Sequence, residues 1–415
     1  MRYVVVFAGA RDHYQVAYAL AEAGTLERFV TEFYRSKVPK WIAGAFPVFD
    51  SRADGRVSAG VPDHLVTVPL GATIVWGLHR LCRSDRLRAW KDAIIGREAG
   101  RIATATGAGL LAYSYYASYA FEKAPAGCTR VIFQVHPHPQ STREILQEEL
   151  RLQPSARASL LAEPDLNFPP AVFARLSQEA GDADFALTPS TFSKRSLISA
   201  GVSEAKIAVV PYGIDTSVFR PKDFSSERGN GALRLIFVGS LVQRKGLSYL
   251  LEAMRRLKGE PIELLLAGRG ARDDGLLREF SDVHFRVLWN ASRDELVSAL
   301  QASDVFVFPS LVESFAHVIL EAMAVGLPIL TTENTAGPDL LEEGRTGFVG
   351  AIRDVEYLVG KIRWFLANRD AIPKMGRACQ EEAAQRTWPR FRQEVRSALE
   401  SFQQSGGIGG KDRKT

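Results

Sequence analysis

The sequence has few cysteines and no long apolar run. Cys82, Cys128 and Cys379 are odd in number and far apart, and none belongs to a C-x-x-C pair. This argues against a disulfide framework and a structural zinc site, and for a reducing compartment. No stretch approaches the roughly 18 consecutive apolar residues of a membrane-spanning helix, and the apolar run at residues 3–7 is too short for a secretory leader. We therefore expect a cytoplasmic protein without a metal site.

The composition indicates a globular protein with more than one domain. The chain has 415 residues, of which 46% are hydrophobic and 24% charged, and a length like this usually divides into two domains. The net charge of +5 suits anionic substrates or an anionic membrane surface. Nucleic-acid binding would show a denser basic stripe, so we expect no nucleic-acid partner.

Short apolar strands alternate with amphipathic helices, which predicts two doubly wound α/β domains with parallel sheets. A strand at 3–8, a turn at Gly9 and a helix at 14–23 form the first unit, and a strand at 233–238 begins a second series. Further strands of the first series are expected at residues 29–34, 64–70, 109–116, 131–135 and 185–190. We place the boundary between the domains near residue 210.

The stretch 304–348 contains two acidic residues, Glu313 and Glu321, at the mouth of a predicted helix and within it. Residues 305–308 read as a buried strand, Ser314 as the N-cap of the next helix, and Gly326 as its end. Glu313 and Glu321 would then lie about 12 Å apart along the helix, whose N-terminus attracts anions. This geometry suits a long ligand with a phosphate in its middle. Taken alone, the pair also fits a salt-bridged helix residue and an ordinary loop acid.

The motifs of this stretch resemble a known family. The spacing Glu313-x7-Glu321 precedes the segments 322–328 (A-M-A-x-G-x-P), 337–339 (G-P-D) and 347–349 (G-F-V). Together they are similar to the C-terminal signature of retaining, GT-B-fold glycosyltransferases of family 4, which carry a glycosyltransferase group 1 domain. The resemblance implies two Rossmann-like domains facing across a cleft. It also implies metal-independent transfer of a sugar from a nucleotide-diphosphate sugar, UDP- or GDP-linked, to a hydroxyl acceptor.

The acceptor would be a glycan, a lipid-linked saccharide or a small metabolite, in polysaccharide or glycoconjugate biosynthesis, and no cofactor is needed. The resemblance also assigns residues. Catalytic roles fall on His136, Lys245 and Glu313, with His138 as the alternative histidine. Donor-binding roles fall on Gly9, Gly239, Arg244, Lys245, Leu288, Ser314, Phe315, Ala316, His317 and Glu321.

The sequence departs from the family pattern at two of these places. Ser240 stands where an arginine is common, and Ala316 stands where the family has glycine. The departures leave open an inactive nucleotide-sugar-binding protein, and a GT-B-fold epimerase or hydrolase is a further alternative.

Other segments are organised around these domains. We predict an acceptor-side domain at 1–209, a donor domain at 210–386, a terminal helix at 387–404 returning to the first domain, and a disordered tail at 405–415. The segment 141–181 would form an acceptor-facing lid. Residues 71–101 interleave arginines with leucines and tryptophans, which fits either a peripheral membrane contact or a helix packed on the sheet.

Overall fold

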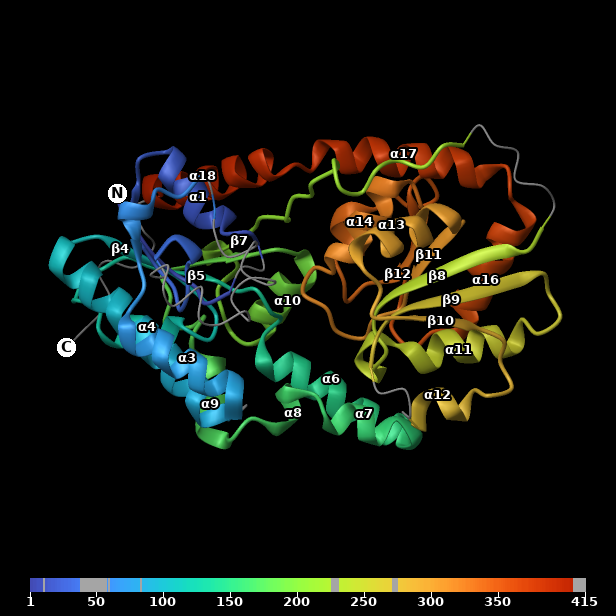
Figure 1. The fold of residues 1–415 in the computed structure, drawn as a ribbon, viewed down its shortest axis with the longest axis horizontal. Coiled ribbons are helices and arrows are strands. Elements are labelled where there is room, and N and C mark those ends of the chain that lie inside the picture. Colours follow the sequence, from blue (N-terminus) through green and yellow to red (C-terminus); the bar gives the residue numbers. More distant parts are fainter. Residues whose placement is uncertain are drawn as a thin grey trace.

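The computed structural model describes residues 1–9, 12–37, 58, 60–82, 84–224, 231–270 and 275–405. Two α/β domains lie side by side along the long axis of the molecule (Figure 1). All but the first residue of the predicted tail lies outside the described part.

The first domain is built on a seven-stranded parallel sheet with the strand order β3-β2-β1-β4-β5-β6-β7. Its strands are β1 (Tyr3–Val6), β2 (Leu26–Val30), β3 (Val66–Thr67), β4 (Gly109–Tyr113), β5 (Arg130–Phe133), β6 (Phe185–Thr188) and β7 (Ile207–Val209). Its principal helices are α1 (Gln15–Glu22), α3 (Leu70–Cys82), α4 (Asp85–Thr106), α5 (Ala117–Glu122) and α10 (Thr191–Ser199). The central strands are apolar and buried on both faces, as parallel sheets require.

The second domain has a six-stranded parallel sheet with the order β10-β9-β8-β11-β12-β13. The strands are β8 (Leu233–Ser240), β9 (Ile262–Arg269), β10 (Arg286–Trp289), β11 (Val305–Phe308), β12 (Ile329–Thr332) and β13 (Gly347–Gly350). The helices are α11 (Leu247–Arg256), α12 (Gly275–Glu279), α13 (Arg293–Ala302), α14 (His317–Val325), α15 (Gly337–Leu340), α16 (Val355–Ala367) and α17 (Ala371–Gln385). In both sheets the strand order reverses beside the first strand, which is where doubly wound folds bind ligands.

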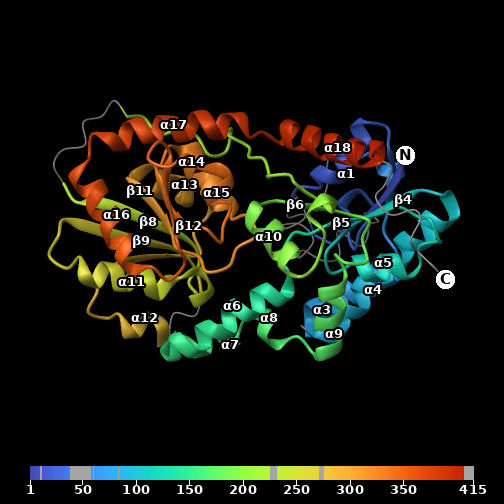
Figure 2. The ribbon, with the colours of Figure 1, turned by 180° about the vertical axis from the view of Figure 1, so that it is seen from behind.

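A run of four short helices leaves the first domain and reaches beneath the second. These are α6 (Pro139–Leu152), α7 (Arg157–Leu161), α8 (Pro164–Asn167) and α9 (Pro170–Gln178). Figures 1 and 2 show α6 and α7 below the gap between the domains, with α7 close to α12. The Glu149 carboxylate on α6 accepts hydrogen bonds from Gln243 and Tyr249 of the second domain, and Arg353 donates to it at 2.8 Å. The segment thus bridges both domains.

The chain crosses between the domains twice, at neighbouring places. After β7 it passes Gly213, and after α17 it returns through Thr387 into α18 (Trp388–Gln404). Ile214 pairs with Thr387 in a parallel bridge, and a Cβ on Gly213 would lie 2.6 Å from the backbone of Thr387. Only glycine permits this approach.

Helix α18 then lies along α1 of the first domain (Figure 1). Arg392 donates to Glu22 at 2.9 Å, and the ring of Phe402 stacks on Phe185 with ring centres 4.6 Å apart. The end of the described chain is therefore part of the first domain's core.

Some predicted elements differ from the observed ones. The strand expected at 29–34 runs from Leu26 to Val30, because Phe33 and Tyr34 are buried aromatic residues of a loop and not of a strand. The strand expected at 64–70 is reduced to Val66–Thr67, and Leu70 already opens α3. The segment 71–101 forms parts of α3 and α4, and none of the described helices is both long and apolar enough to cross a bilayer.

Candidate active site

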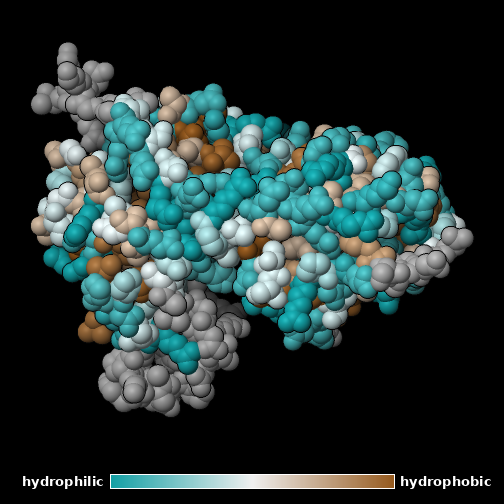
Figure 3. Space-filling model, turned by 90° about the horizontal axis from the view of Figure 1, so that it is seen from above, coloured by the Kyte–Doolittle hydropathy of each residue, from teal (hydrophilic) through white to brown (hydrophobic). Residues whose placement is uncertain are grey.

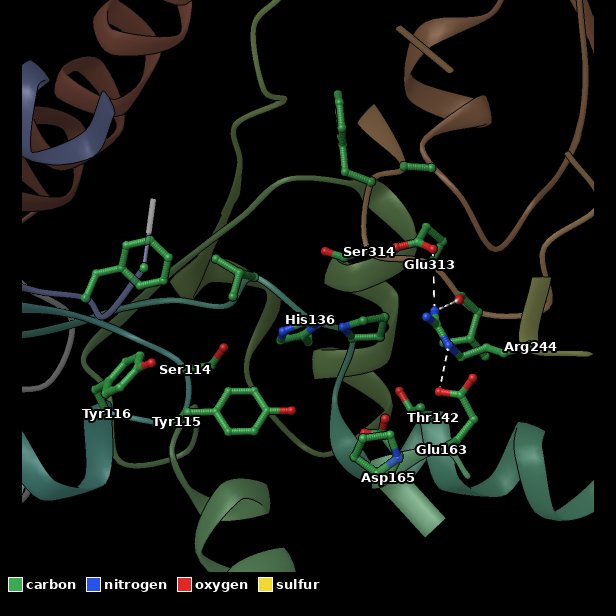
Figure 4. Close-up of a pocket in the computed structure, with 18 of the residues that line it drawn as sticks. Ser114, Tyr115, Tyr116, His136, Thr142, Glu163, Asp165, Arg244, Glu313 and Ser314 are labelled. Carbon is green, nitrogen blue, oxygen red and sulfur yellow. Dashed lines mark hydrogen bonds and ion pairs between the residues drawn. The ribbon is translucent and has the colours of Figure 1, made fainter. Parts of the chain in front are cut away.

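A cavity of about 820 Å³ lies between the two domains, at the carboxyl ends of their central strands. The first domain lines it with residues from the ends of β1, β4 and β5 and from the α6–α8 region. The second domain lines it with Arg244 and with residues 312–317 (Figure 4). This is the position that a doubly wound fold offers to a ligand.

Two cations converge on Glu313 at the edge of this cavity. Lys245 forms an ion pair with the Glu313 carboxylate, and Arg244 approaches the same oxygen at 3.4 Å. Both cations belong to a tight turn at Gln243–Lys245, between β8 and α11. Arg244 is also held by Glu163 at 3.0 Å and donates to the Val312 carbonyl at 3.0 Å. Figure 4 shows the Arg244 side chain between the two carboxylates.

Helix α14 begins two residues later than predicted. Its N-cap is Ala316, with φ 64° and ψ 77°, and not Ser314. The Ser314 side chain instead faces the first domain, with its hydroxyl 3.2 Å from that of Ser193, and the Ser314 carbonyl accepts from Ser190. Glu313 therefore precedes the helix as a loop residue, so the predicted 12 Å spacing along one helix does not apply. The helix ends at Gly326, as predicted.

Ala316 occupies a backbone conformation that glycine adopts more readily. The alanine is 9% exposed and lies where the cavity wall meets the start of α14. As the N-cap residue, Ala316 makes no side-chain hydrogen bond to the start of this helix. The partial positive charge of a helix start is thus turned toward the cavity.

Glu321 lies about one turn past the start of α14, outside the lining of this cavity. Burial raises the pKa of its carboxyl group to about 7, and Arg293 at the start of α13 lowers it in part. A carboxyl group poised near neutral pH is common at functional sites.

His136 lines the cavity from the end of β5, and the two histidines of this region differ in their surroundings. The His136 ring meets Tyr115 edge-on, with ring centres 5.4 Å apart. His138 is buried and caps α6, and its Nε2 lies 3.0 Å from the Ser177 carbonyl. Burial lowers the pKa of His138. Only His136 of the two lines the cavity.

The structure gathers most of the predicted residues. The cavity is lined by Gly9, His136, Arg244, Glu313, Ser314, Phe315, Ala316 and His317. Lys245 contacts it through Glu313, while Gly239, Leu288 and Glu321 are not part of its lining. The sequence analysis missed Tyr115, Glu163 and Asp165, which also line it. Only their positions could have indicated them: Tyr115 follows β4, and Glu163 and Asp165 belong to the segment that bridges the two domains. Among the described residues, no group of three or more His, Cys, Asp or Glu side chains is placed to hold a metal ion.

Comparison with known proteins agrees with this geometry. Residues 219–386 match the family model described as Glycosyl transferases group 1. Sulfoquinovosyl transferase SQD2 of Arabidopsis thaliana is 32% identical over 217 residues, which are 50% of this chain and 42% of SQD2. A D-inositol 3-phosphate glycosyltransferase of Mycolicibacterium paratuberculosis is 30% identical over 250 residues, which are 56% of each chain. The match thus spans about half the length of these relatives.

Solved structures resemble the chain over almost its whole length. Sucrose-phosphate synthase from Thermosynechococcus elongatus superposes with a TM-score of 0.64 at 17% identity, over 98% of this chain and 100% of that one. HepE from Anabaena, solved in complex with UDP and glucose, gives a TM-score of 0.61 at 16% identity, over 97% and 100% of the two chains. The expected GT-B fold, with two Rossmann-like domains, is confirmed. Residues 219–386 form a group 1 glycosyl transferase domain within it.

Proposed function

We propose that the protein is a retaining glycosyltransferase that moves a sugar from a nucleotide-diphosphate sugar, UDP- or GDP-linked, to a hydroxyl acceptor. The acceptor belongs to polysaccharide or glycoconjugate biosynthesis. The observation that carries the proposal is the convergence of Lys245 and Arg244 on Glu313 at a cavity faced by His136. Two neighbouring cations beside a helix N-terminus form a site for a diphosphate.

In the free protein, carboxylates stand where the diphosphate would lie. Glu313 and Glu163 neutralise the two cations, and a bound diphosphate would take over their charge-assisted hydrogen bonds. Released from Lys245, the Glu313 carboxylate would accept hydrogen bonds from hydroxyls of the donor sugar. Glu321, further along α14, would accept those of the ribose.

The proposed chemical step is a displacement on one face of the sugar. The bond between the anomeric carbon and the β-phosphate oxygen breaks, and the acceptor oxygen bonds to the same face of that carbon. The acceptor proton passes to the leaving phosphate. Negative charge that develops on the phosphate is stabilised by Lys245, Arg244 and the start of α14, and His136 lies beside the reacting sugar.

The proposal includes a peripheral contact with an anionic membrane through α3 and α4. Leu70, Ile74 and Leu78 lie one turn apart on α3 and are 75%, 57% and 44% exposed. Trp90 on α4 is 57% exposed, and Arg86 near it is exposed as well. Apolar side chains flanked by cations are typical of membrane-surface helices. The face in Figure 3 is mostly hydrophilic, and several of its hydrophobic patches lie over the first domain.

Thermal shift with a panel of nucleotide sugars identifies the donor, because ligand binding raises the melting temperature. Release of nucleoside diphosphate is then measured with and without candidate acceptors. Acceptor-dependent release supports the transferase. Acceptor-independent turnover would indicate an epimerase or hydrolase, and binding without turnover would indicate an inactive binding protein. Sedimentation with phosphatidylglycerol vesicles tests the membrane contact, which Ile74→Ser combined with Leu78→Ser should weaken.

A further inference from the structure

Tyr115, in the turn after β4, has an unusual backbone conformation. Its φ is 81°, in the left-handed region that a bulky side chain rarely adopts. Such a conformation costs about 1–3 kcal/mol, and residues held in this way cluster at functional sites. Glycine or asparagine would fit the turn with less strain.

The turn is held by a buried carboxylate. Glu179, which follows α9 and is buried, accepts hydrogen bonds from the backbone N–H of Tyr115 at 2.7 Å and from that of Ser118 at 3.2 Å. Arg175 donates to the Tyr115 carbonyl at 3.3 Å. Burial raises the pKa of Glu179 to about 7. The strained backbone of Tyr115 is therefore held by Glu179, a carboxyl group whose removal from water itself costs free energy.

The Tyr115 ring lies on the wall of the cavity, opposite the cations of the second domain. It meets His136 edge-on, and its ring centre lies 6.2 Å from that of Phe168. Figure 4 shows its hydroxyl pointing into the cavity, on the same side as Asp165 and Thr142. The rings of Tyr115 and Phe168 thus offer an apolar surface next to the polar side chains of Asp165 and Thr142.

The charges on this side of the cavity favour an uncharged ligand. Asp92, Glu163 and Asp165 line it from the first domain, and Arg88 is the one described Lys or Arg of that domain in the lining. Asp92 pairs with Lys91 at 3.3 Å and Glu163 with Arg244 at 3.0 Å, so an added phosphate or carboxylate group would meet carboxylates whose cations are already engaged. A sugar ring suits it, because its C–H face packs on an aromatic ring while its hydroxyls reach carboxyl oxygens.

We propose that Tyr115 is an acceptor-binding residue, whose ring receives the C–H face of an uncharged sugar or polyol beside His136. This inference rests on the proposed function and names its acceptor class. It also gives the strain a purpose, since the observed left-handed conformation is the one in which the hydroxyl of Tyr115 points into the cavity.

The test compares Tyr115→Asn with Tyr115→Phe in the full chain. Asparagine accepts the left-handed backbone, so the first variant should keep or raise the melting temperature while it removes the ring. Binding is measured by saturation-transfer NMR with methyl α-glucoside, methyl α-mannoside and methyl α-galactoside, in saturating UDP or GDP. Tyr357→Leu is the control, because Tyr357 lies on α16 of the second domain and does not line the cavity.

We expect at least one glycoside to bind the wild type, with its ring C–H protons receiving the saturation. Its Kd should rise about tenfold in Tyr115→Asn, the size expected for the loss of one aromatic contact, and stay unchanged in Tyr115→Phe and Tyr357→Leu. Equal binding by Tyr115→Asn, or binding only of 6-phosphorylated hexoses, would overturn the inference. So would a wild type that binds nucleotide but none of the glycosides. Failure of UDP and GDP themselves to bind would instead refute the proposed function.

Discussion

The contact between α6 and the second domain gives the sharpest stability prediction. Glu149 is fully buried, and its carboxylate accepts hydrogen bonds from Gln243 at 2.7 Å, Tyr249 at 2.9 Å and Arg353 at 2.8 Å. Glu149→Ala would leave two buried donors, Gln243 and Tyr249, without this carboxylate, and Arg353 would keep only Glu148 of its two anionic partners. Breaking a buried pair from one side costs about 3–5 kcal/mol.

The neighbouring residue offers a matched control. Glu148 bonds to the same Arg353 at 2.7 Å, but its side chain is 57% exposed. Glu148→Ala should cost less than about 1 kcal/mol, the usual worth of an exposed pair. Both variants remove the same charge from adjacent positions of one helix, so the difference between them reports the burial of Glu149 together with its hydrogen bonds from Gln243 and Tyr249.

Urea unfolding followed by circular dichroism, together with calorimetric melting temperatures, measures both costs. A double-mutant cycle with Arg353→Ala isolates the pair, and we expect a coupling above about 1 kcal/mol for Glu149. The reasoning is refuted if Glu149→Ala destabilises the protein no more than Glu148→Ala does.

Three further predictions concern the candidate site. Lys245→Ala should lower the rate of nucleoside diphosphate release about 100- to 1,000-fold, because it removes charge stabilisation at the leaving phosphate, whereas exposed Lys258→Ala should change nothing. The affinity for the nucleotide sugar, whose diphosphate does not titrate in this range, should rise between pH 5.5 and pH 7 when measured by titration calorimetry, and then level off. The reason is that ribose hydroxyls favour the ionised form of Glu321, whose pKa is raised to about 7 in the free protein; Glu321→Gln should abolish this slope. Ala316→Gly should raise the free energy of unfolding by about 0.5–1 kcal/mol by relieving its positive φ, while Ala322→Gly within α14 should lower it by about 1 kcal/mol.

The fold was largely predictable from local pattern. Apolar strands such as Val305–Phe308 and helix ends such as Gly326 depend on residues close in sequence, and they lie where the pattern places them. The bounds of β2, which lies between β3 and β1, were harder to predict, since its sequence is half polar and the buried Phe33 beyond it has the apolar character of a strand residue.

The site was predictable only where a motif marks it. The motif identifies the loop that includes Glu313 and Ala316. The left-handed conformation of Ala316 makes the helix begin at His317, and an alanine in the sequence does not predict such a conformation. Tyr115 and Glu163 owe their places to contacts over long sequence separations, Tyr115 with Glu179 and Glu163 with Arg244. The first pairing lies within the first domain and the second joins the two domains, and local periodicity encodes neither.

The paired crossing at Gly213 and Thr387 constrains how the two lobes can move. Two backbone segments that run side by side and are paired should bend together in one direction more easily than they twist about each other. Opening of the cleft should therefore follow one arc, so that an incoming donor always meets the opposite wall in the same orientation.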